Sequence, residues 1–197
     1  MDKKYFLEQL KTLSDIQNVG VDEEILGEIV SAATFRVIPK GKILASVGDD
    51  KSVAGLVFSG IARAYYIDST GNDITRGFAS AGVMCMDEGF FGYKERICMW
   101  ETLEETTVMF CDTAVIRNII KENVSFKDIW ITFLENALRY KLYRENGFLA
   151  ENATDRYMHF KKLFPDLSER VPQKHIATYL GIAPESLSRI KGVMKET

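Results

Sequence analysis

The spacing of glycines in the middle of the chain constrains the fold most. Glycines recur there every 11 or 12 residues, each within a cluster of turn-forming residues: Gly48, Gly60, Gly71 and Gly82. Between them lie short runs of branched and aromatic side chains, such as 53–58 and 64–67. This rhythm of turns is typical of an all-β sandwich or barrel. We therefore expect strands from Thr34 to about Cys111.

Helical patterns flank the predicted strands. Apolar residues repeat at helical spacing from Tyr5 to Leu13, and Asp22 is placed to cap a second helix with one apolar face. Asp112 and Thr113 follow the last strand and can cap a helix that runs to about Lys121. Near the C-terminus we expect three more helices: one capped by Thr154 and running through Phe164, then 173–180, then 184 to about Lys195.

One long helix is predicted from Ser125 to Leu149. Large side chains step along it by three and four residues, with Ile129, Leu134, Leu138 and Leu142 alongside. A stripe this wide favours packing on both sides, one on the body of the same chain and one on a second copy. We predict that the dimer interface contains Trp130, Phe133, Ala137, Tyr140 and Arg144. The alternative is burial wholly within one subunit.

The segment from Gln173 to Ile190 has the pattern of a helix-turn-helix. Ala177 is small where a second helix would cross, and Gly181 suits the left-handed residue of the turn. The angle between the helices would be filled by apolar residues at fixed offsets, namely Ile176, Leu180, Ile182, Leu187 and Ile190. Pro184 fits the first position of the second helix.

The outward row of that second helix is polar, as reading of the DNA major groove requires. Arg189 can donate two hydrogen bonds to a guanine, and Glu185 can accept from a cytosine amino group or orient Arg189. We expect the remaining contacts to phosphates or base edges from Gln173, Lys174, Ser186, Ser188 and Lys191. An ordinary pair of core helices is the alternative, but it gives no reason for this row.

This order of elements resembles the Crp/Fnr family of bacterial transcription regulators. The resemblance is most specific at Ala177, Gly181, Glu185, Ser188 and Arg189. It implies an α+β fold: a cyclic-nucleotide-binding-like double-stranded β-roll (jelly roll) with flanking helices at 1–122, a dimerisation helix at 123–151, and a helix-turn-helix domain at 152–197. It also implies a homodimer on a palindromic double-stranded DNA operator, with RNA polymerase as a further partner. Because the sequence stops at Thr197, we expect a reduced or absent β-wing.

The sequence departs from the family members that bind cyclic nucleotides. Those proteins carry Gly-Glu and, ten residues later, Arg-Ser/Thr-Ala. Here the matching positions hold Met86-Asp87 and Ile97-Cys98-Met99, and a shift that brings in Arg96 sets Cys85-Met86 against Gly-Glu. We therefore expect neither cAMP nor cGMP as cofactor. The composition of 84–100 instead favours an apolar or aromatic effector, or none, and the predicted pocket residues are Met86, Asp87, Glu88, Cys98, Met99 and Trp100.

Composition narrows the functional classes further. No apolar run is long enough for a membrane span and no signal peptide is evident, so we expect a cytoplasmic protein without a membrane partner. The segment 152–197 holds eight basic and five acidic residues in a chain of net charge −3, which favours a polyanionic partner there. Both histidines lie in that same segment, so the barrel region lacks the histidine cluster of a metal enzyme or a haem site.

Three alternatives to these expectations stay open. The three cysteines, Cys85, Cys98 and Cys111, are expected to be buried and structural, with a reactive thiol as the alternative. No Ser-His-Asp order, phosphate-binding glycine loop or HExxH motif is present, so we expect no enzymatic activity and no metal. Besides an effector-controlled regulator, the sequence allows a ligand-independent DNA-binding protein with the roll as a scaffold. It also allows a protein-interaction module with a vestigial helix-turn-helix.

Overall fold

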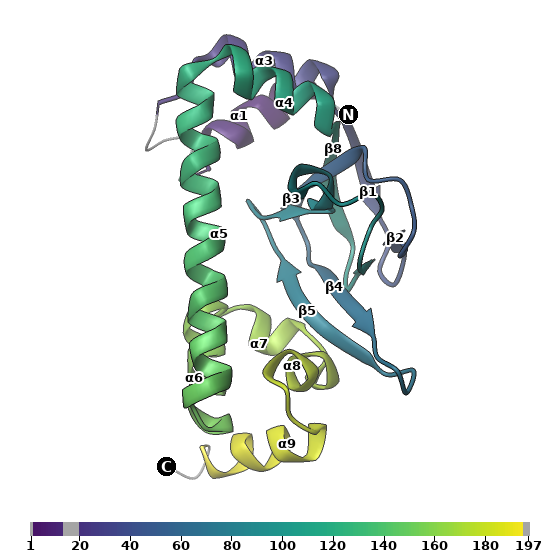
Figure 1. The fold of residues 1–197 in the computed structure, drawn as a ribbon, viewed down its shortest axis with the longest axis vertical. Helices are drawn as coiled ribbons and strands as arrows, with labels where there is room; N and C mark the ends of the chain where they lie inside the picture. Colours follow the sequence, from purple (N-terminus) through teal and green to yellow (C-terminus); the bar gives the residue numbers. More distant parts are fainter. Residues whose placement is uncertain (1, 14–19, 195–197) are drawn as a thin grey trace. The chain divides into compact units, whose positions relative to one another are not determined.

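The computed structural model describes residues 2–13 and 20–194. Its strands form two antiparallel four-stranded sheets, ordered β1-β8-β3-β6 and β2-β7-β4-β5 (Figure 1). The strands are β1 (Thr34–Ile38), β2 (Ile43–Ala45), β3 (Val53–Ser59), β4 (Ala62–Ile67), β5 (Asp73–Ala79), β6 (Met84–Cys85), β7 (Met99–Thr102) and β8 (Thr106–Asp112). The prediction of strands from Thr34 to about Cys111 is confirmed, and the two sheets form the expected β-roll.

Helices precede and follow the strands, as predicted. They are α1 (Lys3–Lys11), α3 (Glu23–Ala32), the 3-10 turn η1 (Glu88–Phe91), α4 (Thr113–Glu122), α5 (Val124–Ala150), α6 (Ala153–Leu163), α7 (Leu167–Arg170), α8 (Gln173–Leu180) and α9 (Pro184–Val193). Figure 1 shows α1, α3 and α4 grouped beside one another. No helix among the described residues is long and apolar enough to cross a membrane.

Helix caps explain most of the predicted boundaries. Asp22 accepts a hydrogen bond from the Glu24 amide, and Asp112 accepts one from the Ala114 amide, so both predicted caps are confirmed. The prediction that Thr154 caps α6 is wrong. Asn152 is the cap, because its Oδ1 accepts from the amides of Thr154 and Asp155 at 2.9 and 3.0 Å. The predicted end of the last helix near Lys195 lies outside the described residues.

The sheet β1-β8-β3-β6 has an apolar core on each face. On β3, Val57 belongs to one core, whereas Leu56 and Phe58 pack against the other. On β8 the same alternation separates Val108 from Met109. The register agrees, because Leu56 pairs with Met109 and Val57 with Val108. Strand residues alternate between faces, so one core fills the roll and the other lies on its outer side under helices.

The chain forms two compact units. One comprises Met1–Ala64 with Phe78–Asn136, and the other comprises Tyr65–Gly77 with Ala137–Thr197. The first holds most of both sheets and the N-terminal helices. The second holds the end of β4, the turn that follows it and most of β5, together with the C-terminal part of α5 and the helices α6 to α9.

Candidate functional site

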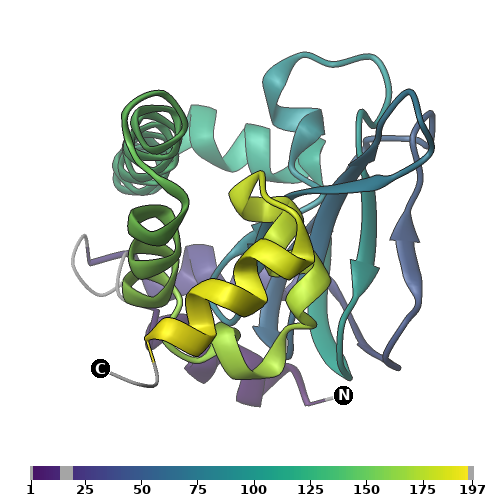
Figure 2. The same cartoon turned by 90° about the horizontal axis from the view of Figure 1, so that it is seen from below.

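Helices α8 and α9 and the turn between them form the predicted helix-turn-helix (Figure 2). Gly181 ends α8 in the left-handed conformation, with φ of 68°. A β-carbon at Gly181 would lie only 2.9 Å from the Phe148 ring, so both the backbone and the space favour glycine. The Ile182 amide then donates to the Ala177 carbonyl at 3.0 Å, which closes the turn.

The angle between the two helices is filled by apolar side chains, as the motif predicts. Ile176, Ala177 and Leu187 are completely inaccessible to solvent, and Leu180 is buried. Ile182 and Ile190 are half-buried at the edge of this cluster. Pro184 occupies the first turn of α9, and Ala183 before it makes no side-chain capping bond. The small size of Ala177 therefore matches its predicted place under the second helix.

The residues predicted to contact DNA lie on the outer side of this motif. Gln173 and Lys174 are exposed at the start of α8, and Glu185, Ser188 and Arg189 are exposed along α9. Ser186 and Lys191 are half-buried. In Figure 2, α9 lies toward the viewer with α8 behind it. No side-chain hydrogen bond or ion pair joins these seven residues to the described part of the chain, so Glu185 does not orient Arg189 here.

The C-terminal half of α5 is bonded to α8 through Tyr140 and Arg144, two of the residues that the sequence predicts in a dimer interface. The Tyr140 and Tyr179 hydroxyl oxygens lie 2.7 Å apart. Arg144 donates to the carbonyls of Arg76 at 2.5 Å and Tyr179 at 3.2 Å. Its guanidinium carbon also lies 4.2 Å from the centre of the Tyr179 ring. Tyr140 and Arg144 therefore pack within their own chain.

Two predicted dimer residues in the N-terminal half of α5, Trp130 and Phe133, also make contacts within the chain. The Trp130 ring lies 4.7 Å from Phe90 and 5.3 Å from Phe133, centroid to centroid. Ala137 is half-buried. The face of α5 that is exposed is a different one, with Ile131, Leu138, Leu142 and Leu149 all in contact with solvent. Of the five predicted dimer residues, Trp130, Phe133, Tyr140 and Arg144 thus make contacts within their own chain, and whether any of them also meets a second copy stays a prediction.

Four of the predicted effector residues lie in the core inside the roll: Met86, Glu88, Cys98 and Trp100. The polar groups among them are hydrogen-bonded to one another or to Arg96. Glu88 is 1% exposed and accepts from Arg96 Nη1 at 3.1 Å, Cys98 Sγ at 3.0 Å and Trp100 Nε1 at 3.3 Å. Met86 is buried beside them, and its carbonyl accepts a second bond from Arg96. Arg96, which the sequence analysis left out of the pocket, is therefore the main partner of Glu88.

The other two effector residues are at the edge of this group. Met99 is half-buried at the start of β7, and its sulfur accepts from the Val47 amide at 3.4 Å. Asp87 precedes η1. None of the six predicted residues lines the large apolar cavity of the β-roll unit, which opens on the other face of the sheet.

The cysteines are buried and unbonded to one another, as expected. Burial raises the pKa of the Cys85 thiol to about 12, and burial also raises the pKa of Cys111. These shifts favour the unreactive protonated thiol at neutral pH. No group of three or more potential metal ligands occurs among the described residues.

The structure is similar to those of several solved regulators. No family model matches the sequence, and no curated protein sequence matches it. FixK2 from Bradyrhizobium japonicum has a TM-score of 0.71 and 17% identity, covering 83% of this chain and 85% of its own. A CooA mutant from Carboxydothermus hydrogenoformans has a TM-score of 0.67 and 20% identity, covering 93% and 84%.

A third similar structure extends the comparison to a protein described by its family. This transcriptional regulator of the Crp/Fnr family from Eubacterium rectale has a TM-score of 0.67 and 16% identity, covering 91% of this chain and 86% of its own. The three comparisons span most of both chains, so the likeness extends over most of the fold. The chain therefore has the fold of the Crp/Fnr transcription regulators.

Proposed function

We propose that this protein is a sequence-specific DNA-binding transcription regulator that acts as a homodimer. The observation that carries the proposal is the division of α8 and α9 into two faces. Their apolar side chains are buried, whereas Glu185, Ser188 and Arg189 are exposed and make no bond to the described part of the chain. A helix that presents unpaired polar groups in this way matches the recognition helix of a helix-turn-helix.

Charge supports the same assignment. Lys174 at the start of α8 and Lys191 near the end of α9 flank the exposed row, where they can contact phosphates. A polar groove in this unit is lined by Gln173 and Lys191 together with Lys161 and Arg170. Phosphate contacts would position α9, and Arg189 would read a guanine.

The exposed stripe on α5 supports the homodimer. Ile131, Leu138 and Leu142 are each about half exposed, and they repeat at intervals of seven and four residues on one side of the helix. That spacing is the pattern of a helix that packs along a second helix. In the proposal, two copies pair through this stripe, so that two α9 helices read the halves of a palindrome, and the DNA-bound dimer acts on RNA polymerase.

We further propose that a small molecule other than a cyclic nucleotide controls the regulator. In the roll, the Glu88 carboxylate and the Arg96 guanidinium are bonded to each other and to neighbouring groups. A ribose and a cyclic phosphate would have to break these bonds to gain the same partners. The free-energy cost of breaking them favours an effector that binds elsewhere.

The test of the proposed function is selection of bound fragments from random duplex DNA over a series of salt concentrations. Wild-type protein is expected to enrich a palindrome and to lose affinity steeply as salt rises. Arg189→Ala is expected to lose about 5-fold to 150-fold in affinity for that palindrome, from a bidentate contact of about 1–3 kcal/mol, and to relax the base preference at one position of each half-site. Lys121→Ala, on the exposed side of α4, is the control and should behave as wild type. An Arg189→Ala variant with unchanged affinity and preference would contradict the proposal.

A further inference from the structure

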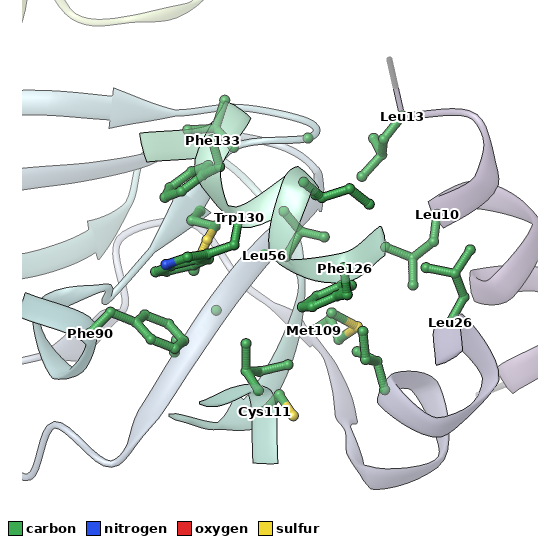
Figure 3. A pocket seen from close by; sticks show the side chains of 18 of the residues that line it. Leu10, Leu13, Leu26, Leu56, Phe90, Met109, Cys111, Phe126, Trp130 and Phe133 are labelled. Carbon is green, nitrogen blue, oxygen red and sulfur yellow. The ribbon is translucent and has the colours of Figure 1, made fainter. Parts of the chain in front are cut away.

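The β-roll unit contains a large apolar cavity on the outer side of the sheet β1-β8-β3-β6. Its volume is about 630 Å³, within the range of about 300–1,000 Å³ that is usual for small-molecule sites. Figure 3 shows aromatic side chains of η1 and α5 on one side and leucines of the N-terminal helices on the other. The walls come from α1, α3, β3, the β5–β6 turn, β8, α4 and α5.

The position of the cavity separates it from the interior of the roll. Leu56 and Met109 line the cavity, whereas their chain neighbours Val57 and Val108 face the opposite core. Figure 3 shows Leu56 and Met109 together beneath α5. The Glu88 carboxylate and its partners belong to that opposite side, so a molecule in the cavity would not disturb their hydrogen bonds.

The lining indicates the chemistry of a ligand. No charged side chain among the residues that the structure describes lines the cavity, so an ion there would lose its hydration without gaining a partner from them. Aromatic rings come from Phe90, Phe126, Trp130 and Phe133, and sulfur atoms from Met84, Met109 and Cys111. Flat aromatic molecules gain favourable ring–ring and sulfur–ring contacts in such surroundings.

One polar group remains available at the wall. The Trp130 indole N–H makes no hydrogen bond within the described part of the chain, and Trp130 is half-buried. An indole N–H at a cavity wall can donate to a ligand oxygen, and such a bond orients the ligand. A neutral ligand with a hydroxyl or carbonyl oxygen would supply that acceptor.

We propose that this cavity is the effector site and that it binds an uncharged aromatic molecule bearing one oxygen acceptor. The regulatory consequence rests on the proposed function. Phe126, Ile129, Trp130 and Phe133 lie on the first half of α5, and the same uninterrupted helix carries Tyr140 and Arg144, which hold α8. A ligand that repacks the first half of α5 therefore acts on the element that anchors the helix-turn-helix.

The test is a titration of the full chain with 1-naphthol, naphthalene and 1-naphthoate. Trp100→Phe leaves Trp130 as the single tryptophan, so its fluorescence reports occupancy of the cavity directly. We expect 1-naphthol to change that fluorescence saturably and 1-naphthoate to bind at least about 10-fold more weakly, because the cavity offers its charge no partner. Calorimetry on wild-type protein checks the same order of affinities without the substitution.

Variants that fill the cavity make the result specific to it. Ala54→Leu and Ile116→Phe add three carbon atoms each at two different walls. Each is expected to weaken 1-naphthol binding by about 10-fold or more, because the added carbons displace at least two methylene-sized contacts of about 0.8 kcal/mol each. Ala150→Leu adds the same bulk at an exposed position and should bind as wild type.

The outcomes separate this inference from the proposed function, because the titration contains no DNA. Absence of 1-naphthol binding to wild type, equal binding of 1-naphthoate, or full binding to both filled variants would overturn the cavity as effector site. Failure to select a DNA sequence would instead count against the proposed function and would leave the titration unaffected.

Discussion

The hydroxyl oxygens of Tyr140 and Tyr179 lie 2.7 Å apart and join the long helix α5 to the first helix of the helix-turn-helix. Tyr179 is only 4% exposed, and Phe160 packs against its ring with centroids 5.4 Å apart. Arg144 covers the same ring and donates to the Tyr179 carbonyl. The pair thus fixes α8 to a helix that also carries the cavity wall.

Removing either hydroxyl removes the hydrogen bond between the two tyrosines. We expect Tyr140→Phe and Tyr179→Phe each to lower the free energy of unfolding by about 0.5–1.5 kcal/mol, the usual net contribution of one hydrogen bond. The double variant should lose clearly less than the two single losses combined. Urea unfolding of the four proteins measures this coupling. Additive losses would show that the two hydroxyls do not interact.

The same pair predicts a loss of stability in alkali. Burial raises the pKa of both Tyr140 and Tyr179 above the ordinary 10. The folded state therefore holds these protons more tightly than the unfolded state does. This contribution to the free energy of unfolding is complete below pH 10 and is lost as pH rises from there toward the folded pKa values. Urea unfolding between about pH 8 and pH 11.5 should show a shallower decline in the Tyr140→Phe/Tyr179→Phe double variant than in wild type. Equal slopes would contradict the prediction.

The helix-turn-helix could be predicted from the sequence because local chemistry determines it. Ala177, the left-handed backbone of Gly181 and Pro184 each answer a local steric demand at a fixed offset. The crowding of Gly181 by Phe148, in contrast, adds a distant contact that the motif does not reveal. The inner face of α5 could not be chosen in the same way. Trp130 and Leu138 are both large and apolar, so helical spacing alone does not say which of them meets the chain's own body.

Gly181 should be the glycine of this motif that tolerates no side chain. Gly181→Ala would force a β-carbon into left-handed backbone and to within 2.9 Å of the Phe148 ring, so we expect a loss of about 1–3 kcal/mol in the free energy of unfolding. Gly192→Ala is the matched control in α9. A β-carbon at Gly192 would have no atom within 4 Å, and the backbone there is helical, so a gain of about 0.4–1 kcal/mol is expected. Thermal unfolding of both variants measures these changes in stability. An unchanged stability of Gly181→Ala would contradict the crowding by Phe148 and the left-handed backbone.

The polar cluster in the roll should depend on Arg96. Arg96→Met leaves the Glu88 carboxylate buried without its cation, and we expect a loss of about 3–5 kcal/mol in the free energy of unfolding. Lys40→Met at an exposed site is the control and should change stability by less than about 0.5 kcal/mol. Urea unfolding at neutral pH measures both. A small effect of Arg96→Met would show that Cys98 and Trp100 suffice to stabilise the Glu88 carboxylate.

The partnership of Glu88 and Arg96 illustrates where sequence reasoning stops. Both residues lie in the stretch 84–100 that is predicted to hold a ligand site. The comparison with the nucleotide-binding motif aligns Ile97, Cys98 and Met99 with Arg-Ser/Thr-Ala, however, so Arg96 falls outside the aligned positions. The apolar cavity could not be predicted from the sequence either. It combines Leu10, Met109 and Phe126, which are far apart in the sequence, and only the packing of helices on the outer side of the sheet brings them together.

The last prediction concerns the exposed stripe of α5. Leu138 and Leu142 are 57% and 56% exposed and lie one helical turn apart, so two glutamates there would place charges in the proposed dimer interface. We expect Leu138→Glu/Leu142→Glu to sediment as a folded monomer with an unchanged circular dichroism spectrum. Lys42→Glu makes the same change in net charge at an exposed site and should remain a dimer.

Trp130→Glu/Phe133→Glu distinguishes the two faces of the same helix. Because Trp130 packs against Phe90 and stacks on Phe133 inside its own chain, these charges should destabilise the β-roll unit rather than separate folded subunits. A lower melting temperature with retained dimers in the folded fraction is the expected result. A stable, folded monomer from Trp130→Glu/Phe133→Glu, together with an intact dimer from Leu138→Glu/Leu142→Glu, would instead assign the interface to the residues that the sequence analysis named.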